Sequence, residues 1–129
     1  MEKLILVDTS ILIDFFIKTD KANSTLLSLV KQGFIFKISA ITVYEIYVGA
    51  NSLQNDFWNE FLEKIEVLPL TANVAKAAVV INTELKRKHC QIDIADLFIA
   101  ATAITNNLKI ATLNIKHFER IEDLVILKS

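Results

Sequence analysis

The feature that most constrains the fold is the short apolar run at residues 4–7, which ends abruptly at Asp8, Thr9 and Ser10. A run of Leu, Ile and Val without polar alternation is typical of a strand that is covered on both faces, as in the middle of a parallel sheet. Asp8 would then lie at the carboxyl end of that strand, where open α/β sheets bind their ligands. Two interpretations of this acid remain open. Asp8, Thr9 or Ser10 caps the helix that follows, or Asp8 is a functional carboxylate.

The composition indicates a single domain over residues 1–129. A chain of this length buries about two-thirds of its unfolded surface, and 53% hydrophobic residues with only two Gly and one Pro favour a compact chain with short loops. The net charge of −1 gives no overall attraction to nucleic acid, so any RNA binding needs a local basic patch. The lone Cys90 excludes an intrachain disulfide and suits a reducing cytoplasm, and no run reaches membrane-spanning length.

Strands and helices are expected to alternate along the chain, which predicts an α/β fold, a three-layer α/β/α sandwich with a mainly parallel central sheet. Pro69 cannot donate to a strand ladder, so the third strand should lie at a sheet margin. The helix at 54–64 carries a wide apolar stripe suited to the core or a subunit interface. Strands are expected at residues 4–7, 34–39, 66–70, 109–113 and 124–127, and helices from about residue 11 and at 20–32, 42–50, 54–64, 71–88 and 93–106, with a loop or helical turn at 114–119.

Acids stand at the start of several predicted helices, and each has a structural explanation. Glu45 would complete a capping box with Thr42. Asp93 would cap the helix at 93–106, and Asp96 in its first turn is favoured by the helix dipole. In a parallel sheet, however, all strand-to-helix junctions lie at one edge, so Asp8, Glu45 and Asp96 would converge and raise each other's pKa. A hard cation such as Mg²⁺ or Mn²⁺ would relieve that repulsion, whereas oxygen-only ligands make zinc unattractive.

Carboxylates that hold such ions, with the remaining coordination left to water and phosphate, are typical of phosphodiester hydrolysis. Two other Mg²⁺-binding classes fit the sequence worse. A response-regulator receiver needs paired acids after its first strand, but Asp8 is followed by Thr9 and Ser10. A haloacid-dehalogenase-type phosphatase needs an Asp at position 10, where Ser10 stands.

Four segments together carry a family resemblance: VDTSILID at 7–14, TVYEIYVG at 42–49, DLFIAATA at 96–103 and ATLNIKHF at 111–118. They resemble the ordered motifs of PIN-domain nucleases, in particular the VapC toxins of toxin–antitoxin pairs. Each motif is weak alone, but four in this order and spacing are specific, and they span nearly the whole chain. The resemblance implies a metal-dependent endoribonuclease with a PIN-like fold that is inhibited by a small antitoxin and is commonly a homodimer.

The resemblance also implies roles for individual residues. Asp8, Glu45 and Asp96 fall on the metal-holding acids, and Asp93, which shares a helix face with Asp96, is an alternative or additional ligand. One or two Mg²⁺ or Mn²⁺ ions would lower the pKa of a bound water, and this water would attack the RNA phosphorus in line. The supporting positions are Thr9, Ser10, Thr112, Asn114 and His117.

Two departures from the family pattern leave the number of metal ions and the activity itself open. Asn114 and His117 stand where many relatives carry acids, and they bring no negative charge. The alternative function is therefore a PIN-like domain that binds RNA or a protein partner without cutting. The basic residues that would position RNA are Lys86, Arg87, Lys116 and Arg120, of which the first two also complement the dipole at a helix end.

Overall fold

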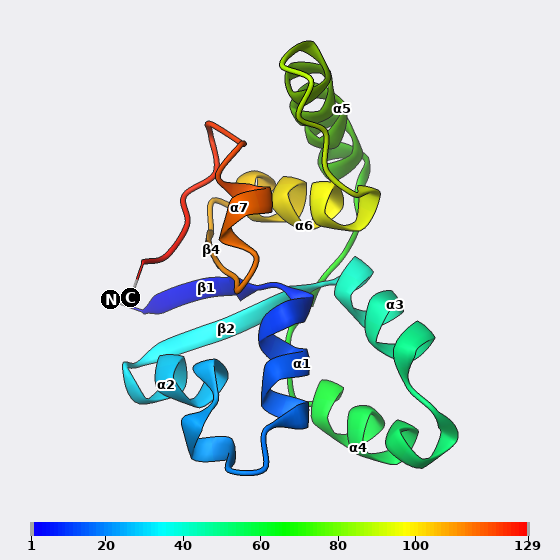
Figure 1. Cartoon of the computed structure of the whole chain (residues 1–129), viewed down its shortest axis with the longest axis vertical. Helices are drawn as coiled ribbons and strands as arrows, with labels where there is room; N and C mark the ends of the chain where they lie inside the picture. Colours follow the sequence, from blue (N-terminus) through cyan, green and yellow to red (C-terminus); the bar gives the residue numbers. More distant parts are fainter. Residues whose placement is uncertain (1, 129) are drawn as a thin grey trace.

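A computed structural model describes residues 2–128, and its centre is a four-stranded sheet in which every neighbouring pair is parallel (Figure 1). The strand order is β3-β2-β1-β4. The strands are β1 (Lys3–Val7), β2 (Phe34–Ser39), β3 (Val67–Leu68) and β4 (Lys109–Ala111). The predicted α/β class is confirmed, and the strand that carries Pro69 next to its end lies at the sheet margin as expected.

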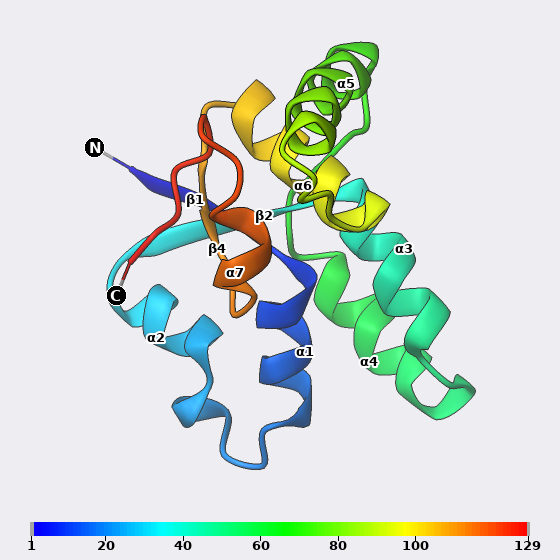
Figure 2. The ribbon, with the colours of Figure 1, turned by 45° about the horizontal axis from the view of Figure 1, so that its top comes forward.

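The helices form a layer on each side of the sheet. Figures 1 and 2 both show α1, α2 and α4 on one side and α5 and α6 on the other. The helical elements are α1 (Thr9–Ile17), the short 3₁₀ helix η1 (Lys21–Asn23), α2 (Thr25–Lys31), α3 (Ala40–Gly49), α4 (Ser52–Leu62), α5 (Ala72–Arg87), α6 (Ile94–Thr105) and α7 (Ile115–Phe118). None of the helices within residues 2–128 combines the length and the apolar character needed to cross a bilayer.

Strand β1 is buried on both faces, which accounts for its unbroken apolar sequence. Ile5 and Val7 belong to the core under α1 to α4, while Leu6 belongs to the core under α5 to α7. All three side chains are fully buried. Because β1 is also flanked by β2 and β4, it is the middle strand that the sequence predicted.

The aromatic stripe of α4 packs inside the chain against α1. The ring centroids of Phe15 and Phe61 lie 5.3 Å apart, and those of Phe16 and Trp58 lie 5.0 Å apart. Trp58 is only 2% exposed. Of the two predicted roles of this stripe, the structure therefore supports a core role for Trp58.

Several predicted details of these elements are wrong. The single helix expected at 20–32 is divided at Ser24 into η1 and α2, because Ser24 ends the first and caps the second. Helix α3 begins at Ala40, where the Ser39 hydroxyl accepts from the backbone N–H of Ile41 at 3.2 Å, so the expected capping box of Thr42 and Glu45 does not exist. Helix α4 begins before residue 54 because Asn51 and Gln54 form a capping box of their own. The expected strand at 124–127 does not form and pairs with β4 only through a single bridge between Ile110 and Ile126.

Candidate active site

An acidic cleft of about 380 Å³ lies where β1 and β4 end. Its lining residues come from the N-cap and the whole length of α1, from α3, from α6 and from the segment after β4. They are Asp8, Thr9, Ser10, Ile13, Asp14, Ile17, Glu45, Asp96, Leu113 and Asn114. Four of them are acids, and none is a Lys or Arg. The structure thus brings together the three acids that the sequence singled out and adds a fourth.

Asp8 is 1% exposed, and both of its carboxylate oxygens accept hydrogen bonds. Oδ1 accepts from the Ser10 hydroxyl at 2.5 Å and from the backbone N–H of Ile11 at 3.3 Å. Oδ2 accepts from the Thr112 hydroxyl at 2.6 Å. Asp8 is therefore the N-cap of α1 and is at the same time fixed to the end of the neighbouring strand.

Burial raises the pKa of the Asp8 carboxyl above its ordinary value, because the charged form loses hydration. The hydrogen bonds from Ser10, Thr112 and Ile11 oppose this rise in pKa. The negative charge of Asp96 adds to it. The two acids are thus close enough to repel each other across the cleft. A cation bound between them would reduce this repulsion.

Glu45 reaches the cleft from the second turn of α3 rather than from its first turn. Its Oε1 accepts from the Thr9 hydroxyl at 2.6 Å. The Thr9 oxygen lies 3.1 Å from the hydroxyl of Thr42, which is fully buried in α3. The sequence predicts capping or supporting roles for these two threonines, and in the structure Thr9 contacts both Glu45 and Thr42.

Asp96 and Asp93 occupy different surroundings. The Asp96 carboxylate lines the cleft, and its Oδ2 lies 3.1 Å from Nδ1 of His117. Asp93 stands at the N-cap position of α6, but its side chain makes no capping hydrogen bond, so the predicted cap is wrong. Asp93 instead lines a separate cavity of about 120 Å³ together with His117 and Arg120.

The segment after β4 is fastened to α1 by the same hydroxyls that hold Asp8. The backbone N–H of Leu113 donates to the Ser10 oxygen at 3.0 Å, and that of Asn114 donates to the Thr112 oxygen at 2.9 Å. This network places Asn114 at the cleft. The structure therefore brings Thr9, Ser10, Thr112 and Asn114 to the acids, while His117 contacts Asp96 from outside the cleft lining.

The four basic residues suggested for RNA binding do not line the cleft. Arg87 pairs with Glu84 on its own helix, and Arg120 donates to the backbone carbonyls of Cys90 and Gln91 at 3.4 and 3.3 Å. The side chains of Lys86 and Lys116 are exposed. A role of these four residues in RNA binding stays a prediction.

The residue that the sequence interpretation missed is Asp14. A signal for it exists, because Ser10, Ile13, Asp14 and Ile17 recur at the spacing of one helix face, and all four line the cleft. The Asp14 carboxylate also accepts from the backbone N–H of Thr25 at 3.1 Å and lies 3.7 Å from Nζ of Lys18. The Asp14 carboxylate therefore also interacts with the start of α2 and with Lys18, which follows α1.

The cleft donors fit a hard divalent cation by their chemistry, since they are carboxylate, hydroxyl and amide oxygens without a Cys or His in the lining. Over the described range 2–128, no three His, Cys, Asp or Glu side chains are grouped closely enough to hold one ion directly. A cation in this cleft would therefore keep several water molecules, as Mg²⁺ commonly does. The acids fit such a partly hydrated ion.

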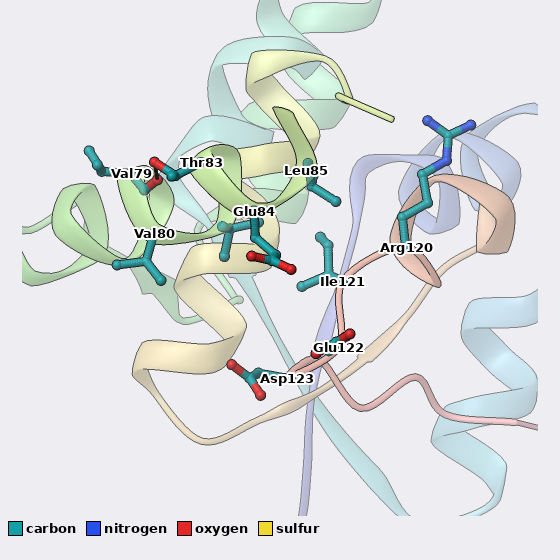
Figure 3. Close-up of a pocket in the computed structure, with 10 residues that line it drawn as sticks. Val79, Val80, Thr83, Glu84, Leu85, Arg120, Ile121, Glu122 and Asp123 are labelled. Atoms are coloured by element: carbon teal, nitrogen blue, oxygen red, sulfur yellow. Dashed lines mark hydrogen bonds between the residues drawn. The ribbon is translucent and has the colours of Figure 1, made fainter. Parts of the chain in front are cut away.

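A larger cavity of about 530 Å³ lies between α5 and residues 120–123 and contains none of the cleft residues (Figure 3). Val80, Ile81, Leu85 and Ile121 give it an apolar lining. Three acids also line it, Glu84, Glu122 and Asp123, and Glu84 is paired with Arg87 and Lys88. Glu122 is paired with Lys88, and Arg120 also lines this cavity. Size alone therefore does not make it the candidate active site, because its acids are accompanied by basic residues, whereas no Lys or Arg lines the acidic cleft.

Comparison with known proteins gives one consistent result. The family profile described as PIN domain matches residues 5–124. "Ribonuclease VapC1" of Methanocaldococcus jannaschii is 37% identical over 95% of this chain and 84% of its own length, and "Ribonuclease VapC10" of Mycobacterium tuberculosis is 33% identical over 94% and 90%. A toxin-antitoxin complex from Klebsiella pneumoniae superposes with a TM-score of 0.75 at 30% identity over 94% and 95% of the two chains. The DNA-bound VapBC of Salmonella typhimurium gives 0.83 at 26% identity over 98% of each.

Proposed function

This chain belongs to the PIN domain family, and from that premise we propose that its acidic cleft is the site at which it cleaves RNA. The chain is a VapC-type ribonuclease toxin of a type II toxin–antitoxin system, like the relatives that match nearly its whole length. The observation that carries the assignment of the site is the convergence of Asp8, Glu45 and Asp96 in one cleft that no Lys or Arg lines.

PIN nucleases of the VapC type are generally metal-dependent, and Asp8, Glu45 and Asp96 are the residues that would hold Mg²⁺ or Mn²⁺ here. A bound ion of this kind lowers the pKa of coordinated water and stabilises negative charge on phosphate oxygens. The residues around the acids hold the carboxylates in a fixed orientation. Ser10 and Thr112 fix the Asp8 carboxylate, so that this buried acid presents one constant geometry to the cleft.

The outer residues of the site complete this arrangement. His117 contacts Asp96 Oδ2 and so limits the rotation of that carboxylate. Asn114 lies in the cleft with its backbone fixed to Thr112, and its amide side chain is suited to donate to a phosphate or a water. Neither residue adds negative charge, so the charge of the cleft comes from Asp8, Asp14, Glu45 and Asp96.

The partner of this toxin is a cognate antitoxin, because the similar solved structures are toxin–antitoxin complexes. We further propose that the toxin forms a homodimer and that RNA, its substrate, is met in the cytoplasm. Size-exclusion chromatography with light scattering, on the toxin alone and with its antitoxin, measures whether the toxin is a homodimer. A monomer at every concentration would contradict the dimer.

The test of the proposed function is digestion of total RNA with Mn²⁺ or Mg²⁺, with EDTA as the control. We expect cleavage by the parent and a loss of at least about 100-fold in Asp8→Asn, because a ligand charge is removed. The matched control is Asp123→Asn, which changes an acid of the other cavity and should cut like the parent.

The alternative is a domain that binds RNA or antitoxin without cutting. Its signature would be a parent protein that binds but cuts no RNA with either metal. Equal cleavage by Asp8→Asn and the parent would remove the cleft as the catalytic site.

A further inference from the structure

Helix α6 brings Asp96 to the cleft, and its buried face is almost entirely apolar. Apolar contacts are non-directional, so a helix with such a face can pack in more than one rotation about its own axis. A directional contact is needed to select one rotation. The buried residues of α6 are Leu97, Ile99, Ala100, Ala101, Thr102 and Ala103, and Thr102 alone among these six has a polar side chain.

Thr102 makes its directional contact with Ser39. The two hydroxyl oxygens lie 3.2 Å apart, and both side chains are fully buried. Ser39 ends β2 and is the N-cap of α3, so the bond joins α6 to the junction that leads into the helix of Glu45. Within residues 2–128 it is the only hydrogen bond between a side chain of α6 and either β2 or α3 and its cap.

The buried hydroxyls are satisfied by one consistent set of donations. The Thr102 hydroxyl donates to the Phe98 carbonyl oxygen at 2.7 Å, because a carbonyl only accepts. A hydroxyl has one proton, so Ser39 must supply the proton of its bond to Thr102. The Ser39 oxygen in turn accepts from the backbone N–H of Ile41 at 3.2 Å. Removal of either hydroxyl would leave a buried polar group unpaired, so this bond favours one packing of α6 over the others.

The position of Asp96 depends on the rotation of α6. A helix with its side chains is about 10 Å wide, so a rotation of about 20° moves the end of a side chain by about 2 Å. The groups of a functional site need to be held within about 0.5 Å of their working geometry. Asp8 and Glu45 line the same cleft from other elements, so a rotated α6 would change the separations of the three carboxylates.

We propose that Thr102 is a positioning residue whose bond to Ser39 fixes the rotation of α6 and thereby the carboxylate of Asp96. The inference rests on the proposed function, because it takes Asp96 as one of the acids that hold the cation. Thr102 and Ser39 do not line the cleft and so touch neither substrate nor cation. Their contribution is to keep the carboxylates at separations that one hydrated cation can bridge.

The first test titrates Mn²⁺ into each protein without RNA and follows the relaxation rate of the water protons, which gives the dissociation constant. Thr102→Val keeps the shape of the side chain and removes the hydroxyl. It should weaken Mn²⁺ binding by about fivefold, the equivalent of one net hydrogen bond. Thr102→Ser keeps a hydroxyl and should bind within about twofold of the parent.

A change at the other end of the bond tests whether the two residues act together. Ser39→Ala removes the same hydrogen bond and should weaken Mn²⁺ binding at least as much as Thr102→Val. The double variant should bind no more weakly than Ser39→Ala alone, because the two changes break one bond. If Thr102→Val does not fold in EDTA melting curves, Ser39→Ala is the variant compared with the parent and with Thr102→Ser.

Asn51→Ala is the matched control for a loss of stability alone. Asn51 is the N-cap of α4 and lies outside the cleft. Its removal should lower the melting midpoint by about 3 to 6 °C and leave the Mn²⁺ affinity unchanged. All affinities are measured well below the melting midpoint of each variant, so that only folded protein is compared.

The outcomes distinguish this inference from the proposed function. A parent that neither binds Mn²⁺ nor cuts RNA removes the proposed function, and the inference with it. A parent that does both while Thr102→Val matches it in Mn²⁺ affinity overturns the inference alone. The inference is equally overturned if Asn51→Ala weakens Mn²⁺ binding as much as Thr102→Val, since a general loss of stability would then explain both.

Discussion

Asp8 serves as a helix cap and as a candidate ligand at the same time, and the two interpretations of the sequence are not exclusive. Its Oδ1 satisfies the backbone N–H of Ile11, which is a capping role. An ionised carboxylate has about four lone-pair positions, and hydrogen bonds from Ser10, Thr112 and Ile11 occupy three of them. The carboxylate therefore keeps capacity for a cation in the cleft that it lines.

The raised pKa of Asp8 predicts how stability changes with pH in the absence of metal. The folded chain holds the Asp8 proton at pH values where the unfolded chain has lost it, because burial and Asp96 disfavour the folded carboxylate. Stability attributable to this group is therefore present below its ordinary pKa of about 4 and falls as the pH rises through the raised folded pKa. Asp8→Asn cannot titrate and should lack this component.

Urea unfolding in EDTA from pH 4 to pH 7 checks this prediction. The free energy of unfolding of the parent should fall with pH relative to that of Asp8→Asn, whereas Asp123→Asn should follow the parent. Parallel curves for the parent and Asp8→Asn would contradict a raised pKa at Asp8.

Asp96 and Asp93 offer a second test at the scale of single residues. Asp96 lines the cleft, and Asp93 neither lines it nor caps α6 with its side chain. Asp93→Asn should keep RNA cleavage within about tenfold of the parent, since its side chain neither lines the cleft nor makes a capping hydrogen bond. Asp96→Asn removes a cleft charge and should lose at least about 100-fold. Initial cleavage rates with Mn²⁺ measure both, and the reverse ranking would move the site one helical turn.

At the scale of elements, the sequence predicts what depends on local pattern. The unbroken apolar run predicts β1 correctly as a middle strand, because burial on both faces leaves no polar alternation. The strand at 124–127 is not predicted correctly, because only Ile110 of β4 pairs with this segment, and the apolar pattern of the segment does not show how many residues find a partner. The predicted start of α3 is also wrong. Ser39 and Thr42 are both good N-cap residues, and the sequence alone does not decide between them.

In the candidate site, too, some features could be predicted from the sequence and others depend on how the helices pack. Parallel strands bring their ends to one edge, so the meeting of Asp8, Glu45 and Asp96 could be predicted from topology. The contact between Thr9 and Thr42 could not, because it depends on how closely α1 and α3 pack. The placement of Asp93 outside the cleft likewise depends on a rotation of α6 that its apolar pattern leaves undetermined, because nearly every face of this helix is apolar.

The capping box of α4 predicts a change in stability without a change in function. Asn51 and Gln54 satisfy each other's backbone N–H at 3.0 Å in both directions, and they lie outside the acidic cleft. Asn51→Ala should lower the free energy of unfolding by about 1 kcal/mol and the melting midpoint by about 3 to 6 °C. Asn51→Asp should melt close to the parent. Circular dichroism melts and the RNA assay check both parts, and a cleavage defect in Asn51→Ala would contradict the separation.

At the scale of the whole molecule, the two cores on either side of β1 hold the strand ends that bring the acids together. The repulsion between Asp8 and Asp96 is therefore built into the folded state and is absent when the chain unfolds. A cation that binds only the folded chain must stabilise it by mass action. Metal binding can thus be read from unfolding alone, without RNA or antitoxin.

Melting curves in EDTA and in millimolar Mg²⁺ or Mn²⁺ therefore provide a test of the metal site. With a dissociation constant on the order of 1 mM and about 10 mM Mg²⁺, the stabilisation is about 1.4 kcal/mol. For a chain of this length it should raise the melting midpoint by about 3 to 6 °C. Asp8→Asn should melt above the parent in EDTA, because one repelling charge is gone, and should respond much less to either ion. A parent whose melting midpoint is the same in EDTA and in either ion would contradict a metal site in the cleft.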